Sequence, residues 1–277
     1  MTIPEIDLSI NPDLARKILT GFIKSEINRV GFARAVVGLS GGIDSALSCV
    51  LAAEALGPEN VLAVRMPYKS SSPESLEHAK MVIEQFKVRS ETVEITDMVD
   101  ALISHDPEMS KTRKGNIMAR ARMIVLYDRS EAFKGLVVGT GNKTEILLGY
   151  STLWGDSASA LNPIGDLYKA QVRQLSRALG IPSVIVDKPP SADLWVGQTD
   201  ENELGFTYDD VDKLLYLLVD HRYSPEECVE AGFDQTFVET VVTRIRRNQF
   251  KRMLPPIAKL SNRTIGYDFL YLRDWGT

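Results

Sequence analysis

Ala35-Val36-Val37-Gly38-Leu39 runs directly into Ser40-Gly41-Gly42-Ile43-Asp44-Ser45, and an Ala- and Leu-rich stretch then continues to Gly57. The first five residues are a short apolar run typical of a buried strand, and the Ala/Leu-rich stretch favours a helix. A glycine-rich turn therefore joins a strand to a helix, which is the opening unit of an α/β protein with a parallel sheet.

The composition of this turn points to a phosphate-binding loop. Glycines let the backbone approach an anion closely, and the following helix offers unpaired N–H groups with a positive dipole end. The Gly-Lys-Ser/Thr ending of a Walker A loop and the GxGxxG spacing of a dinucleotide fingerprint are both absent. A tight turn that merely uses Ser and Gly is the alternative, but SGGxDS between a strand and a helix favours the phosphate site.

Asp44 requires its own explanation, because a carboxylate at a phosphate-binding helix start repels the ligand unless a cation lies between them. Mg²⁺ prefers one or two carboxylates together with substrate phosphates, so Asp44 is a candidate magnesium ligand. The alternative is a simple interaction with the helix dipole. Glu145, in the segment Gly139-Thr140-Gly141-Asn142-Lys143-Thr144-Glu145 after a later strand, offers a second carboxylate on the same side of the sheet.

Strands and helices alternate along the rest of the chain. The patterns predict strands at 35–39, 61–66, 91–95 and 136–139, with a weaker fifth at 184–186. Helices are predicted from Asn11-Pro12 to about Gly31, and over 43–57, 73–86, 115–133 and 168–179. Residues 208–249 read as all helix, with Pro225 near the start of one. We expect a single α/β domain over 1–277, with a Rossmann-like parallel sheet flanked by helices and a helical C-terminal part at about 208–250.

Composition narrows the classes of function. The 277 residues carry 32 Lys and Arg against 37 Asp and Glu, a net charge of −5, which argues against nucleic acid as a partner. The N-terminus lacks a signal-peptide pattern, and no apolar run reaches membrane-spanning length. Cys49 and Cys228 are the only cysteines and have no metal-ligand spacing, so we expect two reduced thiols and a cytoplasmic protein.

Ser40-Gly41-Gly42-Ile43-Asp44-Ser45 resembles the pyrophosphate loop of the ATP pyrophosphatases, a superfamily that includes NAD, GMP and asparagine synthetases and several tRNA-modifying enzymes. The resemblance implies an adenine nucleotide alpha hydrolase-like fold and cleavage of ATP between its α and β phosphates. Further blocks, in order, resemble ammonia-dependent NAD synthetases along nearly the whole chain. They are Arg65–Tyr68, Gly115–Met123, Gly139–Glu145, Asn162–Lys169, Lys188–Asp193 and Gly197–Gly205.

Carried over position by position, the resemblance implies three groups of site residues. ATP would contact Gly38, Ser40, Gly41, Gly42, Ile43, Asp44, Ser45, Arg65, Thr140, Lys169 and Ser191. Mg²⁺ would be held by Asp44 and Glu145. The dinucleotide substrate would face Asn116, Arg120, Trp154, Asp156, Glu203 and Lys251.

The sequence departs from the family pattern at three positions. Leu153 stands where the family carries Lys, Ala160 where it carries Asp, and Phe250 where it carries His. One explanation is that other residues, for example Trp154 and Asp156, bind the same substrate. Amidation of a different acid by a paralogue is another, and a nucleotide-binding sensor without turnover is a third.

The family resemblance also implies the reaction and its partners. Deamido-NAD would be amidated with ammonia through an acyl-adenylate, with release of AMP and pyrophosphate and with Mg²⁺ as cofactor. The segment 188–205 is long enough to form a lid over the intermediate. Neither cysteine lies in a glutaminase context, so ammonia would be free or supplied by a separate glutaminase, and the family's homodimeric state is expected.

Overall fold

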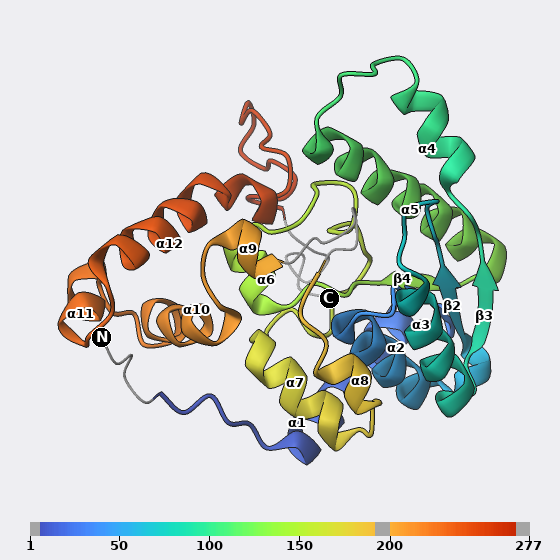
Figure 1. Ribbon diagram of the computed structural model, residues 1–277, viewed down its shortest axis with the longest axis horizontal. Coiled ribbons are helices and arrows are strands. Elements are labelled where there is room, and N and C mark those ends of the chain that lie inside the picture. The colour runs from blue at the N-terminus through green and yellow to red at the C-terminus, as the bar shows by residue number, and fades with distance from the viewer. Residues whose placement is uncertain (1–5, 192–199, 270–277) are drawn as a thin grey trace.

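A four-stranded parallel sheet forms the centre of the computed structural model, which describes residues 6–191 and 200–269 (Figure 1). Its strands are β1 (Ala35–Gly38), β2 (Val61–Arg65), β3 (Arg89–Thr92) and β4 (Leu136–Val138), in the order β3-β2-β1-β4. β1 therefore lies between β2 and β4, and the chain moves outward from it in both directions. The carboxyl end of such a strand is the switch point where open α/β sheets bind ligands.

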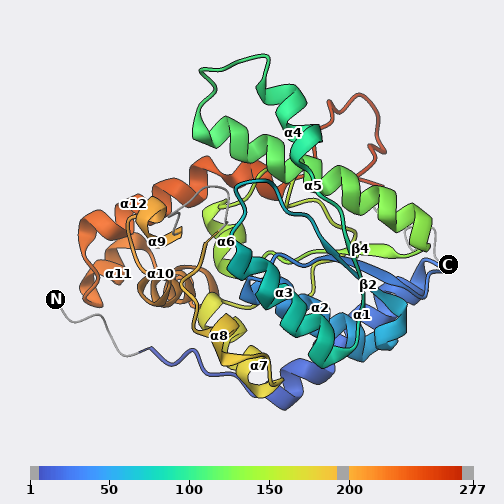
Figure 2. The same cartoon turned by 45° about the vertical axis from the view of Figure 1, so that its right-hand side comes forward.

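Alternating side chains of β1 belong to different apolar clusters, because successive residues of a strand point to opposite faces. Ala35 and Val37 pack with α1 (Pro12–Arg29), α2 (Ile43–Leu56), α3 (Pro73–Phe86) and α7 (Lys169–Ala178). Val36 packs on the other face with α4 (Thr96–Ile103) and α5 (Lys111–Phe133). Figure 2 shows these two helix layers on opposite sides of the sheet.

The C-terminal helices form a third apolar cluster beside the sheet. It contains Leu8 from the N-terminal segment, Leu148 from α6 (Lys143–Leu148), Tyr168, and buried residues of the C-terminal helices. Those helices are α10 (Tyr208–Leu215), η2 (Tyr216–Asp220), α11 (Pro225–Glu230) and α12 (Gln235–Arg247), followed by η3 (Gln249–Arg252). They lie together on the left of Figure 1, away from the strands. The short helices η1 (Pro58–Asn60), α8 (Ser183–Val186) and α9 (Asp200–Leu204) complete the described elements.

The parallel α/β fold with a helical C-terminal part is as the sequence predicts, but several details differ. The predicted fifth strand at 184–186 is wrong: these residues form helix α8, with Ile185 and Val186 buried against the first cluster. An apolar run this short does not distinguish a strand from a buried helical turn. The third strand ends at Thr92, before most of the predicted range 91–95, and α5 begins at Lys111 rather than Gly115. The C-terminal part is a series of short helices with breaks after Asp220 and Glu230.

None of the helices within 6–191 and 200–269 combines the length and apolar character needed to span a bilayer.

Candidate active site

The Ser40–Ser45 loop folds into a compact turn at the carboxyl end of β1. Ser45 Oγ donates to the Gly42 carbonyl (2.9 Å) and lies 3.0 Å from Ser40 Oγ, while the Gly42 amide donates to Ser40 Oγ (3.2 Å). Gly41 has φ +86°, and a Cβ at this position would lie 2.0 Å from the Ser75 carbonyl oxygen. Only glycine fits there, because α3 passes directly beside the loop.

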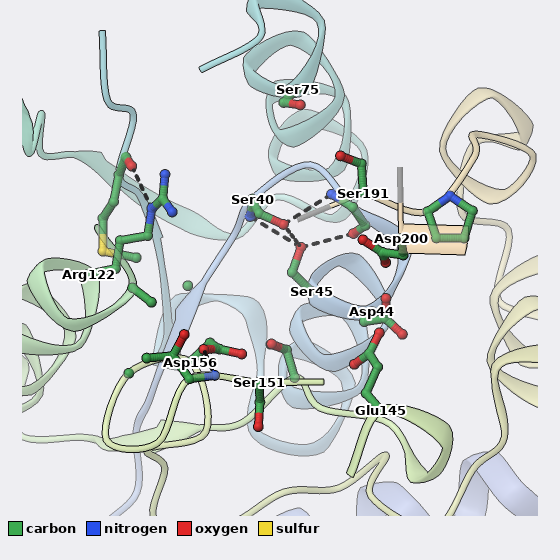
Figure 3. A pocket seen from close by; sticks show the side chains of 18 of the residues that line it. Ser40, Asp44, Ser45, Ser75, Arg122, Glu145, Ser151, Asp156, Ser191 and Asp200 are labelled. Atoms are coloured by element: carbon green, nitrogen blue, oxygen red, sulfur yellow. Dashed lines mark hydrogen bonds between the residues drawn. The ribbon is translucent and has the colours of Figure 1, made fainter. Parts of the chain in front are cut away.

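Helix α2 begins at this loop without a side-chain cap. Its N-cap residue is Gly42, which has no side chain that could accept a hydrogen bond from the first turn. The first amides of the helix thus remain available to an anion, and the helix dipole adds a positive potential. Ser40 and Ser45, beside these amides, line a pocket (Figure 3).

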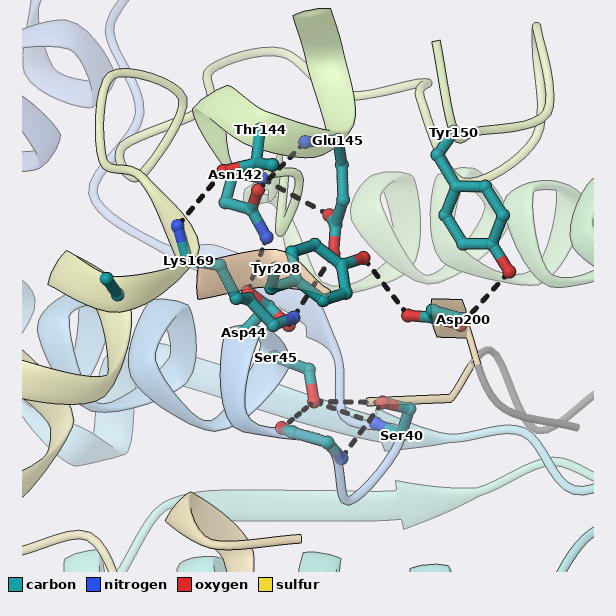
Figure 4. Close-up of polar contacts among 12 residues, drawn as sticks. Ser40, Asp44, Ser45, Asn142, Thr144, Glu145, Tyr150, Lys169, Asp200 and Tyr208 are labelled. Atoms are coloured by element: carbon teal, nitrogen blue, oxygen red, sulfur yellow. Dashed lines mark hydrogen bonds and ion pairs between the residues drawn. The ribbon is translucent and has the colours of Figure 1, made fainter. Parts of the chain in front are cut away.

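Asp44, Lys169 and Glu145 meet in a largely buried cluster beside Ser40 and Ser45 (Figure 4). Lys169 Nζ lies 2.5 Å from Asp44 Oδ2 and 3.2 Å from Glu145 Oε1, and Lys169 is only 2 % exposed. Asn142 Nδ2 donates to Asp44 Oδ1 (2.8 Å), while the Asn142 side chain caps α6 by accepting from the Glu145 amide (3.0 Å). Two carboxylates and one ammonium from three helix N-termini thus converge on one point.

Burial and the neighbouring charges shift the pKa values of Glu145 and Lys169 in opposite directions. Burial raises the pKa of the Glu145 carboxyl, and the positive charge of Lys169 offsets only part of that effect. Burial alone would lower the pKa of Lys169, but Asp44 and Glu145 outweigh it and raise the pKa above the ordinary lysine value. Lys169 is therefore held as a cation at neutral pH.

The cluster forms one wall of a cleft of about 1250 Å³ between the sheet and the C-terminal helices. Arg65 also lines this cleft, and its buried Nε has no hydrogen-bond partner among the described residues. A buried N–H that lacks a partner is costly unless a ligand or water satisfies it. Arg65 and Lys169 are thus two of the cationic side chains that line the cleft.

Fifteen of the eighteen residues named from the sequence line this cleft. They are Gly38, Ser40, Gly42, Ile43, Asp44, Ser45, Arg65, Asn116, Thr140, Glu145, Asp156, Lys169, Ser191, Glu203 and Lys251. Gly41 does not line it, because its backbone faces Ser75.

Arg120 and Trp154 are likewise outside the residues that line the cleft. The Arg120 guanidinium donates through Nε (3.3 Å) and Nη2 (3.2 Å) to the Leu153 carbonyl. Trp154 has a positive φ of 60° and is about half exposed. Arg120 is therefore bonded to the 149–157 loop, and neither side chain lines the cleft in this conformation.

On the substrate side of the cleft, several predicted residues stabilise the 149–157 loop. Lys251 Nζ donates to the carbonyls of Gly149 and Ser151 (both 2.7 Å), and the Thr152 hydroxyl donates to Asn116 Oδ1 (2.8 Å). Asp156 accepts from the Thr152 amide at 2.7 Å. Among the departures from the family pattern, Ala160 and Phe250 are exposed.

The structure adds residues that the sequence reasoning did not single out. Asp200 is 4 % exposed and accepts hydrogen bonds from the hydroxyls of Tyr150 (3.0 Å) and Tyr208 (3.2 Å) (Figure 4). Arg122 lines the opposite wall, where its Nε donates to the Met66 carbonyl (3.1 Å). Asn142 could have been found from sequence, since Asn142-x-x-Glu145 is a capping-box pattern that predicts the start of α6.

The predicted lid lies partly outside the described residues, which omit 192–199. At its described start, Lys188 Nζ lies 3.3 Å from Ser75 Oγ and 3.5 Å from Glu74 Oε2, so the segment meets the first turn of α3. At its other end, α9 carries Asp200 and Glu203 into the cleft.

The parallel α/β sheet with an SGGxDS loop at its switch point places the chain in the PP-loop class of ATP-using enzymes. The NAD synthase family model matches residues 16–255, and the chain belongs to this family of ligases that form a C–N bond.

Relatives in this family match the chain over nearly all of its length. An NH₃-dependent NAD⁺ synthetase of Trichlorobacter lovleyi is 59 % identical over 269 residues, covering 97 % of this chain and 98 % of that protein. One from Chlorobium phaeovibrioides is 56 % identical, covering 97 % of each.

Solved structures agree with the fold. An NMN synthetase from Francisella tularensis superposes with a TM-score of 0.81 at 31 % identity, over 91 % of this chain and 100 % of that one. An NH₃-dependent NAD synthetase from Campylobacter jejuni, in complex with a nitrate ion, gives a TM-score of 0.78 at 32 % identity, over 90 % and 100 % of the two chains.

Proposed function

We propose that this chain converts deamido-NAD to NAD with ATP and ammonia. The observation that carries the proposal is the convergence of the uncapped α2 N-terminus, Lys169 and two carboxylates on one cleft. The cleft volume of about 1250 Å³ exceeds the roughly 300–1,000 Å³ typical of a site for one small ligand, which suits two nucleotides bound together. Relatives above 50 % identity carry the name of this activity.

In the first chemical step, a nicotinate carboxylate oxygen attacks the ATP α-phosphorus and pyrophosphate leaves. Amides of the first turn of α2, Ser40 and Ser45 would bind the departing phosphates, and Lys169 would offset their charge. Lys169 is well suited to this because Asp44 and Glu145 keep it protonated. Ammonia then attacks the acyl carbon, AMP leaves, and the proton released passes to solvent or to a nearby base.

Asp44 and Glu145 also suit a magnesium ion. Their side chains both lie within 3.2 Å of one cationic atom, so a single cation can be shared by both carboxylates, and oxygen donors are those that Mg²⁺ prefers. Magnesium bound there would neutralise charge on the pyrophosphate leaving group. Asn142 holds Asp44 in place by donating to its Oδ1 (2.8 Å).

The remaining site residues would act on binding. Arg65, Thr140 and Ser191 would contact ATP, and Asn116, Asp156, Glu203 and Lys251 the dinucleotide. Arg120 and Trp154 would reach a substrate only if the 149–157 loop rearranges, because Arg120 is bound to the Leu153 carbonyl. The segment 188–205 would cover the acyl-adenylate and keep water from it.

A homodimer is part of the proposal. Exposed apolar side chains lie on α1 (Leu14, Ile18 and Phe22) and on α5 (Ile124 and Tyr127), where a second copy could cover them. Sedimentation of the purified chain at assay concentration measures the state directly, and a monomer would contradict this part.

The test is an assay of the purified chain with ATP, Mg²⁺, deamido-NAD and ammonium, followed for NAD, AMP and pyrophosphate together. We expect the three products in equal amounts. Asp44→Asn should nearly abolish pyrophosphate release with an unchanged far-UV circular dichroism spectrum, whereas Asp97→Asn, at an exposed carboxylate on α4, should retain activity. Near-normal activity of Asp44→Asn would disprove the role of this carboxylate.

Nicotinate mononucleotide should be tested in parallel as acceptor, since one structural relative is an NMN synthetase. A higher kcat/KM with the mononucleotide would overturn the proposed substrate but keep the ATP chemistry. ATP binding without pyrophosphate release from any acid would favour the sensor hypothesis instead.

A further inference from the structure

Within helix α7, which carries Lys169, Gln171 Oε1 accepts from the Tyr168 amide (3.0 Å), but the next two amides are capped by other elements. Its N-cap residue is Tyr168, whose side chain makes no capping hydrogen bond and instead donates to Asp220. The first two amides of the helix are satisfied by other elements: the Lys169 amide donates to Thr144 Oγ1 (3.1 Å) and the Ala170 amide donates to Asp212 Oδ2 (2.8 Å). The helix start is therefore fixed by Gln171 of α7 itself together with α6 and α10.

The two capping side chains are also bonded to each other. Thr144 Oγ1 donates to Asp212 Oδ1 at 2.6 Å, and both residues are fully buried. The single hydroxyl proton of Thr144 goes to Asp212, so its oxygen is left to accept from the Lys169 amide. Both carboxylate oxygens of Asp212 are likewise in use.

This arrangement connects Asp212 to both cleft residues that flank Asp44. Thr144 immediately precedes Glu145 on α6, and the Lys169 amide belongs to the residue whose Nζ pairs with Asp44 and Glu145. A shift of α7 relative to α6 would separate Nζ from the carboxylates. We propose that Asp212, through Thr144 and the Ala170 amide, is a positioning residue that sets Lys169 against Glu145 and Asp44; this rests on the proposed role of Lys169 in ATP chemistry.

A buried carboxylate is an expensive way to join helices, because a well-packed apolar contact usually stabilises as much without desolvating a charge. The hydrogen bonds of the carboxylate do supply a direction and a fixed spacing, which an apolar contact cannot. Catalytic groups need such spacing, since displacement by about 1 Å can cost roughly a hundredfold in rate.

The experiment uses the full-length chain and four variants. Thr144→Val removes the hydroxyl with little change in shape, Thr144→Ser restores it, and Asp212→Asn removes the charge. Ser176→Ala is the matched control: Ser176 is buried on the same helix α7, and its hydroxyl has no hydrogen-bond partner in the described part of the chain. Calorimetric titration with Mg-ATP gives the dissociation constant and the number of sites separately, and kcat is measured at saturating substrates.

We expect Thr144→Val and Asp212→Asn to weaken Mg-ATP binding about tenfold with the number of sites unchanged, and to lower kcat by about ten- to a hundredfold. Thr144→Ser should recover to within about threefold, and Ser176→Ala should match the unchanged chain. The positioning role of Asp212 is overturned if the variants bind Mg-ATP at fewer sites but with unchanged affinity, because that result marks only a loss of folded protein. It is also overturned if Thr144→Ser is as impaired as Thr144→Val. An unchanged chain that binds Mg-ATP but makes no NAD would overturn the proposed function only, because affinity is read without an acceptor.

Discussion

Gly41 combines two constraints that no other residue type satisfies. Its φ of +86° is a conformation that side chains disfavour, and a Cβ there would lie 2.0 Å from the Ser75 carbonyl oxygen. Because that atom belongs to the backbone of α3, the conflict can only be relieved by moving the phosphate loop or the helix.

We predict that Gly41→Ala lowers the free energy of unfolding by more than about 2 kcal/mol and weakens ATP binding. The control is Gly42→Ala, where φ is −85° and the nearest atom to a new Cβ is Ser40 Oγ at 3.4 Å, so the cost should stay below about 1 kcal/mol. Denaturant unfolding of both variants measures the difference. Equal stabilities for the two variants would contradict the steric argument.

Asp212 makes a second prediction at the residue scale, because burial raises its pKa to about 6. A carboxyl whose pKa is higher in the folded than in the unfolded state stabilises the fold at low pH and loses this contribution as pH rises through the folded pKa. Between pH 5 and pH 7, ionisation of Asp212 should cost the fold about 1 kcal/mol.

The Asp212→Asn variant has no carboxyl at this position, so its stability carries no cost of ionising a buried group. The unfolding free energy of the variant minus that of the unchanged chain should therefore increase by about 1 kcal/mol from pH 5 to pH 7, whatever its sign at either end. Urea unfolding at several pH values measures the slope, and contributions from groups that do not interact with Asp212 cancel in the difference. A flat or opposite slope would show that Asp212 is not a carboxylate with a raised pKa.

At the scale of elements, the site depends on where three helices begin. The N-termini of α2, α6 and α7 place Asp44, Glu145 and Lys169 around one point. Each helix start is fixed differently: α2 by a glycine loop, α6 by its own capping box, and α7 mainly by Thr144 and Asp212 from other helices, with Gln171 of α7 accepting from the Tyr168 amide. The start of α2 is thus set by nearby residues, whereas the start of α7 depends on tertiary contacts. This difference explains which helix starts the sequence could predict.

The loop and its flanking strand and helix were predictable because their signals form one continuous stretch of sequence, 35–57. The start of α6 was also encoded locally, in Asn142 and Glu145, although it was not predicted. The capping of α7 could not be predicted, because Asp212 lies 42 residues from Ala170 and meets it only in the folded chain. The strand predicted at 184–186 is wrong for a different reason. Its apolar pattern covers only three residues, which is too short to distinguish a strand from helix α8.

At the scale of the whole molecule, the cleft belongs to both the sheet and the C-terminal helices. Ser40 and Asp44 come from the sheet side, whereas Arg244 and Lys251 come from the C-terminal part. The N-terminal segment adds a further link, because Leu8 packs in the C-terminal cluster while its carbonyl accepts from Gln171 and Gln174 of α7. A cleft shared in this way is preserved only if the two parts remain folded together, which is our physical reason for proposing one domain.

We therefore predict that the chain unfolds in a single calorimetric transition, and that Val241→Ala shifts all of it. Val241 is fully buried in the C-terminal cluster, so the variant should lose about 2 kcal/mol and lower the midpoint by roughly 5 °C. Thr243→Ala, at an exposed position on the same helix, is the control and should leave the midpoint unchanged. If Val241→Ala instead splits off a separate low-temperature transition, the C-terminal helices are a domain of their own, and the cleft is an interface between two domains whose relative motion could open and close it.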